Sequence, residues 1–218
     1  MKNVFIYFAV LTIFISCSPD EYENSERYNF FPLEIQNEWT YNILPESTFY
    51  PNQTFNMKVL KDTVLNIQSE SIKTYIVESS RSSNDNKWFV FWNHDENGNI
   101  IQNGVQTNGE IFLDRSIQYK KNPQVGEFWN FNHIIYGSDS GFFIEESEIK
   151  CVNSDTSIVT EAGTFECYIY FDNFKRWEDS DEKRYWFINS DVGLIKYQII
   201  TDGEIELEYS LKEYKINN

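Results

Sequence analysis

Short apolar runs separated by turn residues extend from Asn37 to the C-terminus, and no long stretch keeps the period of a helix. The clearest run lies near the C-terminus, where apolar and charged residues alternate; its apolar members are Ile205, Leu207, Tyr209 and Leu211. A period of two places apolar side chains on one face of a strand and polar ones on the other. The pattern therefore predicts an all-β chain whose strands each have a buried and a wet face.

Turn residues fall between consecutive runs, for example at 95–99, 108–109 and 202–203. Runs joined in this way make sequential hairpins, so we expect an antiparallel meander, with a β-sandwich as the alternative. Two runs, residues 88–92 and 185–188, are apolar on both faces and are predicted to be central strands. Two further runs predict one inward face each: Phe55, Met57 and Val59, and Phe165, Cys167, Ile169 and Phe171.

The first residues predict a lipoprotein signal peptide. Residues 4–17 are apolar, follow Lys2 and end in Ser16 and Cys17. A permanent membrane helix needs about 20 apolar residues, so cleavage before Cys17 explains this short run better. The residues at 14–17 resemble the bacterial lipobox, in which the cysteine receives diacylglycerol. We expect residues 1–16 to be removed and Cys17 to carry the lipid; an ordinary secretory signal is the alternative.

Residues 17–29 are polar and acidic without apolar periodicity, which predicts a flexible tether ahead of a single all-β domain at 30–218. Asp20 and Glu21 resemble the signal that sends Bacteroidota-type lipoproteins to the cell surface. The expected location is the outer membrane, lipid-anchored, with the body surface-exposed or otherwise at the periplasmic face.

The charge of the chain excludes some partners. Its formal net charge is −16 at pH 7, and aromatic residues make up 17% of it. Nucleic acid and anionic lipid surfaces are poor partners for so acidic a protein. We expect most carboxylates to form a solvated coat around an aromatic-rich core.

Cys151 and Cys167 are the thiols that remain once Cys17 is lipidated. The envelope outside the inner membrane is oxidising, so a disulfide between them is one expectation. Two separate buried thiols, each packed as a small apolar group, are the alternative.

No residue pattern predicts catalysis, a metal or another cofactor. His94 and His133 are the only histidines, and neither has a ligand partner at zinc spacing. The composition does not exclude a Ser-His-Asp triad, but no Gly-x-Ser-x-Gly motif places a serine as the nucleophile. Residues 95–99 are expected to form a polar turn rather than a calcium loop. Asp62-Thr63-Val64 matches the O-glycosylation pattern of Bacteroidota-type exported proteins, which makes Thr63 a candidate modification site.

Three segments resemble motifs of a group of uncharacterised Bacteroidota-type envelope lipoproteins. Residues 31–41 resemble its PLxxGNxWxY opening, with Gln36 where glycine is usual. Residues 161–167 resemble its AGTF hairpin, and residues 185–196 resemble its VGLIK hairpin. The group has no established catalytic residues. The resemblance implies a curved antiparallel sheet or incomplete barrel of the lipoprotein-carrier (LolA-like) kind.

Residues 31–41 and 122–131 also resemble each other. Each has a proline, a branched aliphatic residue, a turn and then a tryptophan, Trp39 or Trp129, with spacings that differ by one residue. A proline fixes the entry of the chain and the tryptophan begins an inward-facing strand. We expect two equivalent strand starts.

These observations predict a non-enzymatic, lipid-anchored binding protein of unknown ligand. A carrier of lipid or another hydrophobic molecule in a half-barrel cavity is one alternative. A surface glycan-binding protein is the other, because tryptophans can stack on sugar rings. Most tryptophans are expected in the core, and Trp177, in a polar stretch, is the candidate for ligand stacking. The tryptophans considered are Trp88, Trp92, Trp129, Trp177 and Trp186.

Overall fold

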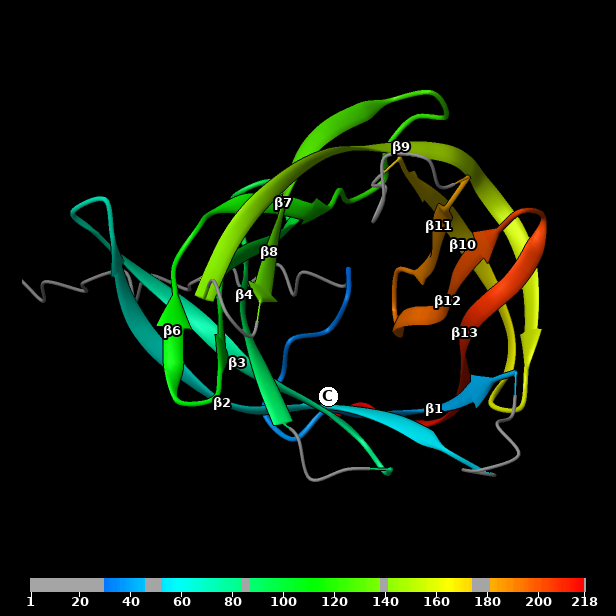
Figure 1. The fold of residues 1–218 in the computed structure, drawn as a ribbon, viewed down its shortest axis with the longest axis horizontal. Helices are drawn as coiled ribbons and strands as arrows, with labels where there is room; N and C mark the ends of the chain where they lie inside the picture. The colour runs from blue at the N-terminus through cyan, green and yellow to red at the C-terminus, as the bar shows by residue number, and fades with distance from the viewer. Residues whose placement is uncertain (1–29, 46–51, 84–86, 138–140, 174–180, 218) are drawn as a thin grey trace, which may run out of the picture.

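The chain folds into one antiparallel sheet that curves into a nearly closed barrel (Figure 1). The computed structural model describes residues 30–45, 52–83, 87–137, 141–173 and 181–217. The strands are β1 (Glu38–Leu44), β2 (Thr54–Ile67), β3 (Glu70–Arg81), β4 (Lys87–His94), β5 (Ile100–Thr107), β6 (Glu110–Phe112), β7 (Ser116–Tyr119), β8 (Phe128–Gly137), β9 (Gly141–Thr160), β10 (Gly163–Asp172), β11 (Lys183–Asn189), β12 (Gly193–Thr201) and β13 (Glu204–Lys215). None of the described segments is a helix that could span a membrane.

The strand order is β6-β5-β4-β3-β2-β1-β13-β12-β11-β10-β9-β8, with β7 paired to β5. Two meanders, β1 to β6 and β8 to β13, are therefore joined where the first strand pairs with the last. The predicted all-β meander and incomplete barrel are confirmed. The sandwich alternative is not observed, because all these strands belong to one sheet.

The two ends of the sheet meet through side chains instead of a backbone ladder. The indole of Trp129 on β8 donates to the carbonyl of Ile117 on β7 at 3.1 Å. The amide of Gln102 on β5 donates to the carbonyl of Asn132 on β8 at 3.3 Å. These bonds cover strand edges that would otherwise be free to pair with another chain.

Residues 30–37, which we call the entry segment, close one end of the barrel. Phe30 and Phe31 are fully buried. The ring of Phe31 stacks on Tyr119 at 5.7 Å and meets Trp92 edge-on at 5.2 Å. Its amide donates to the carbonyl of Ser190 at 2.9 Å. The N-terminal motif thus acts as an aromatic plug that belongs to the core.

Two of the sequence motifs contact each other directly. The indole of Trp39 donates to the carbonyl of Val192 at 2.6 Å, and the hydroxyl of Tyr41 donates to the carbonyl of Leu194 at 2.9 Å. Both aromatic side chains are buried, so these bonds satisfy polar groups that water cannot reach. The opening motif and the VGLIK-like hairpin therefore form one structural unit.

The two similar segments adopt the same turn, as expected of equivalent strand starts. The fourth residue of the turn at 34–37 donates to the first at 3.0 Å, and the corresponding bond in the turn at 124–127 is 2.9 Å. The third residue has positive φ in both: 72° at Gln36 and 93° at Gly126. This is the arrangement of a type II turn, which favours glycine at that place.

The likeness extends to the strand that each turn contacts. The amide of Gln36 donates to Val59 on β2, and the amide of Gly126 donates to Cys151 on β9, both at 2.8 Å. Each half of the sheet therefore begins with a turn that is hydrogen-bonded to the second strand of that half.

Two strand-face predictions have different outcomes. Phe55, Met57 and Val59 are buried as expected. On β10, however, the register shifts after Cys167, and Tyr170 becomes the next fully buried aromatic side chain. The prediction that Ile169 and Phe171 share the inward face of Cys167 is wrong, because a β-bulge changes which residues point inward.

The C-terminal strand follows its predicted alternation only in part. Ile205, expected on the inward face, is 47% exposed at the start of the strand. Tyr209 and Leu211 are buried, as expected. Glu208, expected on the wet face, is also buried. Its carboxylate accepts a bond from Gln198 at 2.5 Å and lies 3.3 Å from the ammonium of Lys196. The partners on β12 thus compensate for the desolvation of one acidic side chain of this strand.

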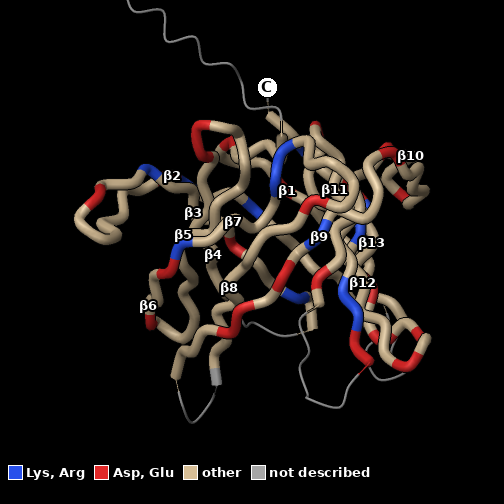
Figure 2. The backbone as a smooth tube through the Cα atoms, turned by 90° about the horizontal axis from the view of Figure 1, so that it is seen from above, with Lys and Arg blue, Asp and Glu red and all other residues tan. Residues whose placement is uncertain are grey.

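Figure 2 shows acidic residues distributed over turns and strands around the molecule, with basic residues interspersed. This distribution fits a solvated coat better than a concentrated acidic site.

Candidate functional site

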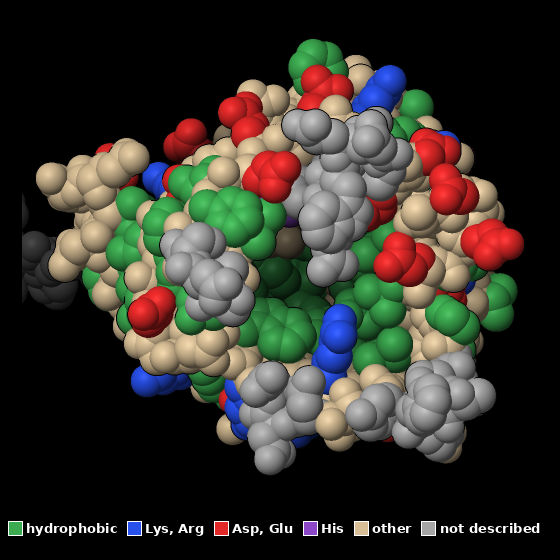
Figure 3. Space-filling model, in the orientation of Figure 1, with side chains coloured by type: hydrophobic (Ala, Val, Ile, Leu, Met, Phe, Trp, Pro, Cys, Tyr) green, Lys and Arg blue, Asp and Glu red, His purple; other side chains and the backbone are tan. Residues whose placement is uncertain are grey.

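A cavity of about 370 Å³ lies at the end of the barrel opposite the entry segment. Figure 3 shows the hollow, with hydrophobic side chains on its walls and a basic side chain at its edge. Its lining residues are Arg81, Trp88, Val105, Gln106, Thr107, Ile134, Tyr136 and Phe142.

Strand direction explains why these residues gather there. Arg81 ends β3, Trp88 lies near the start of β4, and Thr107 ends β5. Neighbouring antiparallel strands place such ends together at one rim. The opposite rim holds the β4–β5 turn, where His94 contacts the carbonyl of Phe30 at 2.8 Å. The cavity and the plug therefore occupy opposite ends of the sheet.

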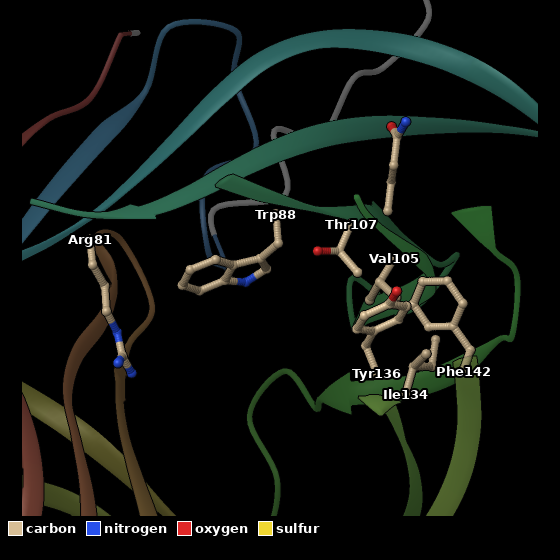
Figure 4. A pocket seen from close by; sticks show the side chains of 8 residues that line it. Arg81, Trp88, Val105, Thr107, Ile134, Tyr136 and Phe142 are labelled. Atoms are coloured by element: carbon tan, nitrogen blue, oxygen red, sulfur yellow. The ribbon is translucent and has the colours of Figure 1, made fainter. Parts of the chain in front are cut away.

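Trp88 is the aromatic residue of the wall formed by β3 to β5, and stacking holds its ring in place. The ring of Trp88 lies 5.7 Å from that of Phe55, nearly parallel at 17°. Phe55 in turn stacks on Tyr209 at 4.6 Å and 20°. One face of Trp88 is thus supported by the core. Figure 4 shows its ring projecting into the cavity.

The facing wall comes from the β8–β9 hairpin. Tyr136 and Phe142 are directly opposite each other in the ladder, and their rings meet edge-on at 5.1 Å. Phe142 also lies 5.4 Å from Phe112 on β6. The hairpin therefore packs across the far end of the sheet, and the cavity lies where the two ends of the sheet approach each other.

Arg81 is the charged residue of this lining. One guanidinium nitrogen, Nη2, donates to the hydroxyl of Tyr209 at 2.5 Å, and the guanidinium carbon lies 5.9 Å from the centre of that ring. Its Nε–H is buried and has no acceptor among the described residues. A buried donor without an acceptor is costly, so this side chain is incompletely satisfied by the protein.

A second polar cluster contains a serine, a histidine and an aspartate. His133 Nε2 lies 2.9 Å from Asp172 Oδ2 and 2.9 Å from Ser147 Oγ. In a hydrolytic triad the aspartate and the serine contact opposite ring nitrogens, so that the ring can accept the serine proton. Here both oxygens contact the same nitrogen, and the cluster does not have that geometry.

The tyrosine hydroxyls of the interior are neutral. Burial raises the pKa of Tyr41, Tyr119 and Tyr197 above the ordinary value. These side chains therefore add hydrogen-bonding capacity to the core without adding charge.

The two cysteines are free and buried. The register places Cys151 opposite Tyr170, three residues beyond Cys167 on the same strand. Three residues of strand span about 10 Å, and a disulfide joins α-carbons at most about 6.8 Å apart. The structure has the two separate thiols that were the alternative to a disulfide.

The other predicted sites fall in different places. Cys17 and Trp177 lie outside the described residues. Thr63 is half-buried on β2, opposite Thr74 of β3, and its glycosylation stays a prediction.

The turn at 95–99 is held by its own aspartate. Asp95 Oδ1 accepts the amides of Asn97 at 2.9 Å and Asn99 at 2.8 Å, and Oδ2 accepts the side-chain amide of Asn99 at 2.9 Å. This is the polar turn that was expected. No group of three or more candidate metal ligands is found among the described residues.

The described tryptophans divide by accessibility. Trp92, Trp129 and Trp186 are buried in the core, as expected for most of them. Trp88 lines the cavity. Sequence reasoning did not single out Arg81, although it follows Val77 and Ser79 in the inward phase of β3. An arginine in that phase at the end of a strand was the available signal.

No protein-family model and no curated protein matches the chain. A candidate lipoprotein from Parabacteroides distasonis, solved as a crystal structure, is 16% identical, with a TM-score of 0.44 over 85% of this chain and 98% of that one. A candidate exported protein with a YmcC-like fold from Bacteroides fragilis is 12% identical, with a TM-score of 0.41 over 86% of this chain and 99% of that one. Scores of this size assign no function to this chain.

Proposed function

We propose that this protein is a non-enzymatic, lipid-anchored envelope protein that binds a small apolar or amphiphilic molecule in the cavity at the barrel's open end. The observation that carries the proposal is the cavity of about 370 Å³ between the wall that holds Trp88 and Val105 and the apolar β8–β9 hairpin. Ligand sites of proteins are typically concave, mainly apolar and about 300–1,000 Å³ in volume.

The supports for binding are physical. Trp88, Val105 and Phe142 come from three strands that the fold holds in fixed register, so the walls are formed before a ligand arrives. A preformed apolar site loses little conformational entropy on binding. The absence of triad geometry around His133 gives the hydrolase alternative no support.

The position of the cavity suits a protein tethered at its N-terminus. Phe30 lies at the plugged end, beside the β4–β5 turn, and the cavity lies at the other end. With Cys17 lipidated and residues 17–29 as a flexible tether, the chain would enter the body at the plugged end and leave the open end accessible to the aqueous phase. A ligand would then enter from the aqueous side.

A neutral apolar fluorophore, N-phenyl-1-naphthylamine, tests the proposal. We expect saturable binding at one site per protein. Val105→Trp, which fills the cavity from β5, should abolish it. Val64→Trp is the matched control, because Val64 is 60% exposed on β2 and is not part of the cavity lining. Binding that Val105→Trp leaves unchanged would contradict the proposed site.

Glycan binding is the second candidate, because Trp88 offers an aromatic surface within reach of the polar residues Thr107 and Arg81. Titration with neutral oligosaccharides separates the two functions. Saturable oligosaccharide binding that Trp88→Ala removes, together with no binding of the fluorophore, would replace the apolar ligand with a sugar.

A further inference from the structure

We propose that the natural ligand is a single-chain amphiphile with an anionic head group, and that Arg81 binds this head group while the chain lies against Trp88 and the β8–β9 hairpin. The inference rests on the proposed function and specifies the chemistry of its ligand.

The hydrogen bond of Arg81 to Tyr209 leaves most of its donors without an acceptor among the described residues. A guanidinium has five N–H groups in a planar fork. Among the described residues only the hydroxyl of Tyr209 accepts from it, at 2.5 Å. That bond, and the position of the guanidinium over the Tyr209 ring, orient the fork without neutralising it. A carboxylate or phosphate could accept two parallel bonds from such a fork.

The other arginines of the described segments have acidic partners. Arg184 Nε lies 2.6 Å from Glu182 Oε1, and Arg115 Nη1 lies 3.7 Å from Glu70 Oε2. Arg81 has no such carboxylate within the described part of the chain. Its positive charge at the wall of an apolar cavity is therefore uncompensated by these segments, which favours a ligand that supplies the negative charge.

The lining residues are arranged as an amphiphile requires. Figure 4 shows Arg81 on one side, Trp88 in the middle, and Ile134, Tyr136 and Phe142 together on the far side. The charged end of the cavity is thus separated from its most apolar end. A ligand with charge at one end and a hydrocarbon chain at the other would pair both ends with like chemistry.

The net charge of the protein opposes the binding of anions, so a preference for anions needs a local cause. At −16 the molecule as a whole repels anions. Long-range electrostatic attraction would favour cationic ligands. A preference for an anionic head group must therefore arise from a local cation.

Calorimetric titration of the full-length mature protein with decanoate, decyl phosphate and decanol at neutral pH tests the inference. The three probes share one hydrocarbon chain and differ in head-group charge and chemistry. We expect the two anions to bind about 10- to 100-fold more tightly than the alcohol, as for hydrogen bonds to a charged group. The stronger of the two anions would identify the head group as a carboxylate or a phosphate.

Variants locate the effect. Arg81→Gln should remove the preference for the anions over decanol, and Arg81→Lys should keep part of that preference. Arg115→Gln removes the same charge away from the cavity and should keep the preference. Should Arg81→Gln not fold, the comparison of anions with alcohol on the wild-type protein still decides.

Two results would overturn the inference. If decanol binds as tightly as both anions, or if Arg81→Gln keeps the full preference, the anionic head group is wrong while the cavity's binding function stands. If neither the three probes nor N-phenyl-1-naphthylamine binds, the proposed function fails together with the inference.

Discussion

Gln36 is predicted to be a strained residue whose replacement by glycine stabilises the protein. It occupies the third position of a type II turn with φ of 72°. Its side chain is exposed, and the hydrogen bond to the carbonyl of Val59 comes from its backbone amide, so no side chain is needed for it. The equivalent turn in the second half has Gly126, so the chain itself contains the comparison. Gln36→Gly and Gly126→Gln form a reciprocal pair.

The magnitude follows from backbone energies. A left-handed conformation costs an L-residue roughly 1–2 kcal/mol. Glycine offsets part of this gain, because it loses about 0.5–1 kcal/mol more in entropy on folding. Gln36→Gly should therefore raise the free energy of unfolding by about 0.5–1 kcal/mol. A Cβ added at Gly126 would meet no atom within 4 Å, so Gly126→Gln should lower it by a similar amount through the backbone alone.

Urea unfolding followed by tryptophan fluorescence measures both variants. We expect the midpoints to move in opposite directions with unchanged m-values, and the melting temperatures to shift by about 2–4 °C per kcal/mol for a domain of this size. The reasoning would be refuted if Gln36→Gly destabilised the protein, or if Gly126→Gln had no effect.

Three further predictions concern buried polar groups. Asn37→Ala should lower the free energy of unfolding, measured in urea, by about 1–3 kcal/mol. The substitution removes the hydrogen bonds of the Asn37 side chain to the carbonyl of Pro32 and the amide of Asn217. A loss no larger than that of the exposed Asn66→Ala would contradict the prediction. Burial lowers the pKa of His94 in the folded protein, so below pH about 6.5 the unfolded chain binds a proton first and the free energy of unfolding should fall as the pH drops. His94→Gln should flatten this dependence of the free energy of unfolding on pH. An unchanged slope in the variant would be evidence against this role of His94. Burial raises the pKa of Cys167 to about 12 and the pKa of Cys151 above its usual value. Iodoacetamide should therefore label neither thiol in the native protein and both thiols after denaturation. A disulfide would leave both cysteines unlabelled in each state.

The equivalence of the two turns was visible in sequence only as a proline, a turn and a tryptophan at slightly different spacings. Local chemistry explains that part, because a type II turn and an inward tryptophan depend on a few consecutive residues. The bond from Trp39 to Val192 joins residues far apart in the chain and could not be read from either motif. The bulge after Cys167 was missed for a related reason, since a change of register depends on the partner strand.

The sequence by itself determined the all-β class, the antiparallel order of neighbouring strands and the largely apolar inward faces, because alternation and turn residues act over a few positions. Only the tertiary structure decided how the sheet closes and what its cavity contains. Arg81, Trp88 and Phe142 lie on different strands, and their meeting depends on sheet curvature and on the way the β8–β9 hairpin crosses the far edge. Curvature is a sum of small twists over the whole sheet, and no local pattern records that sum.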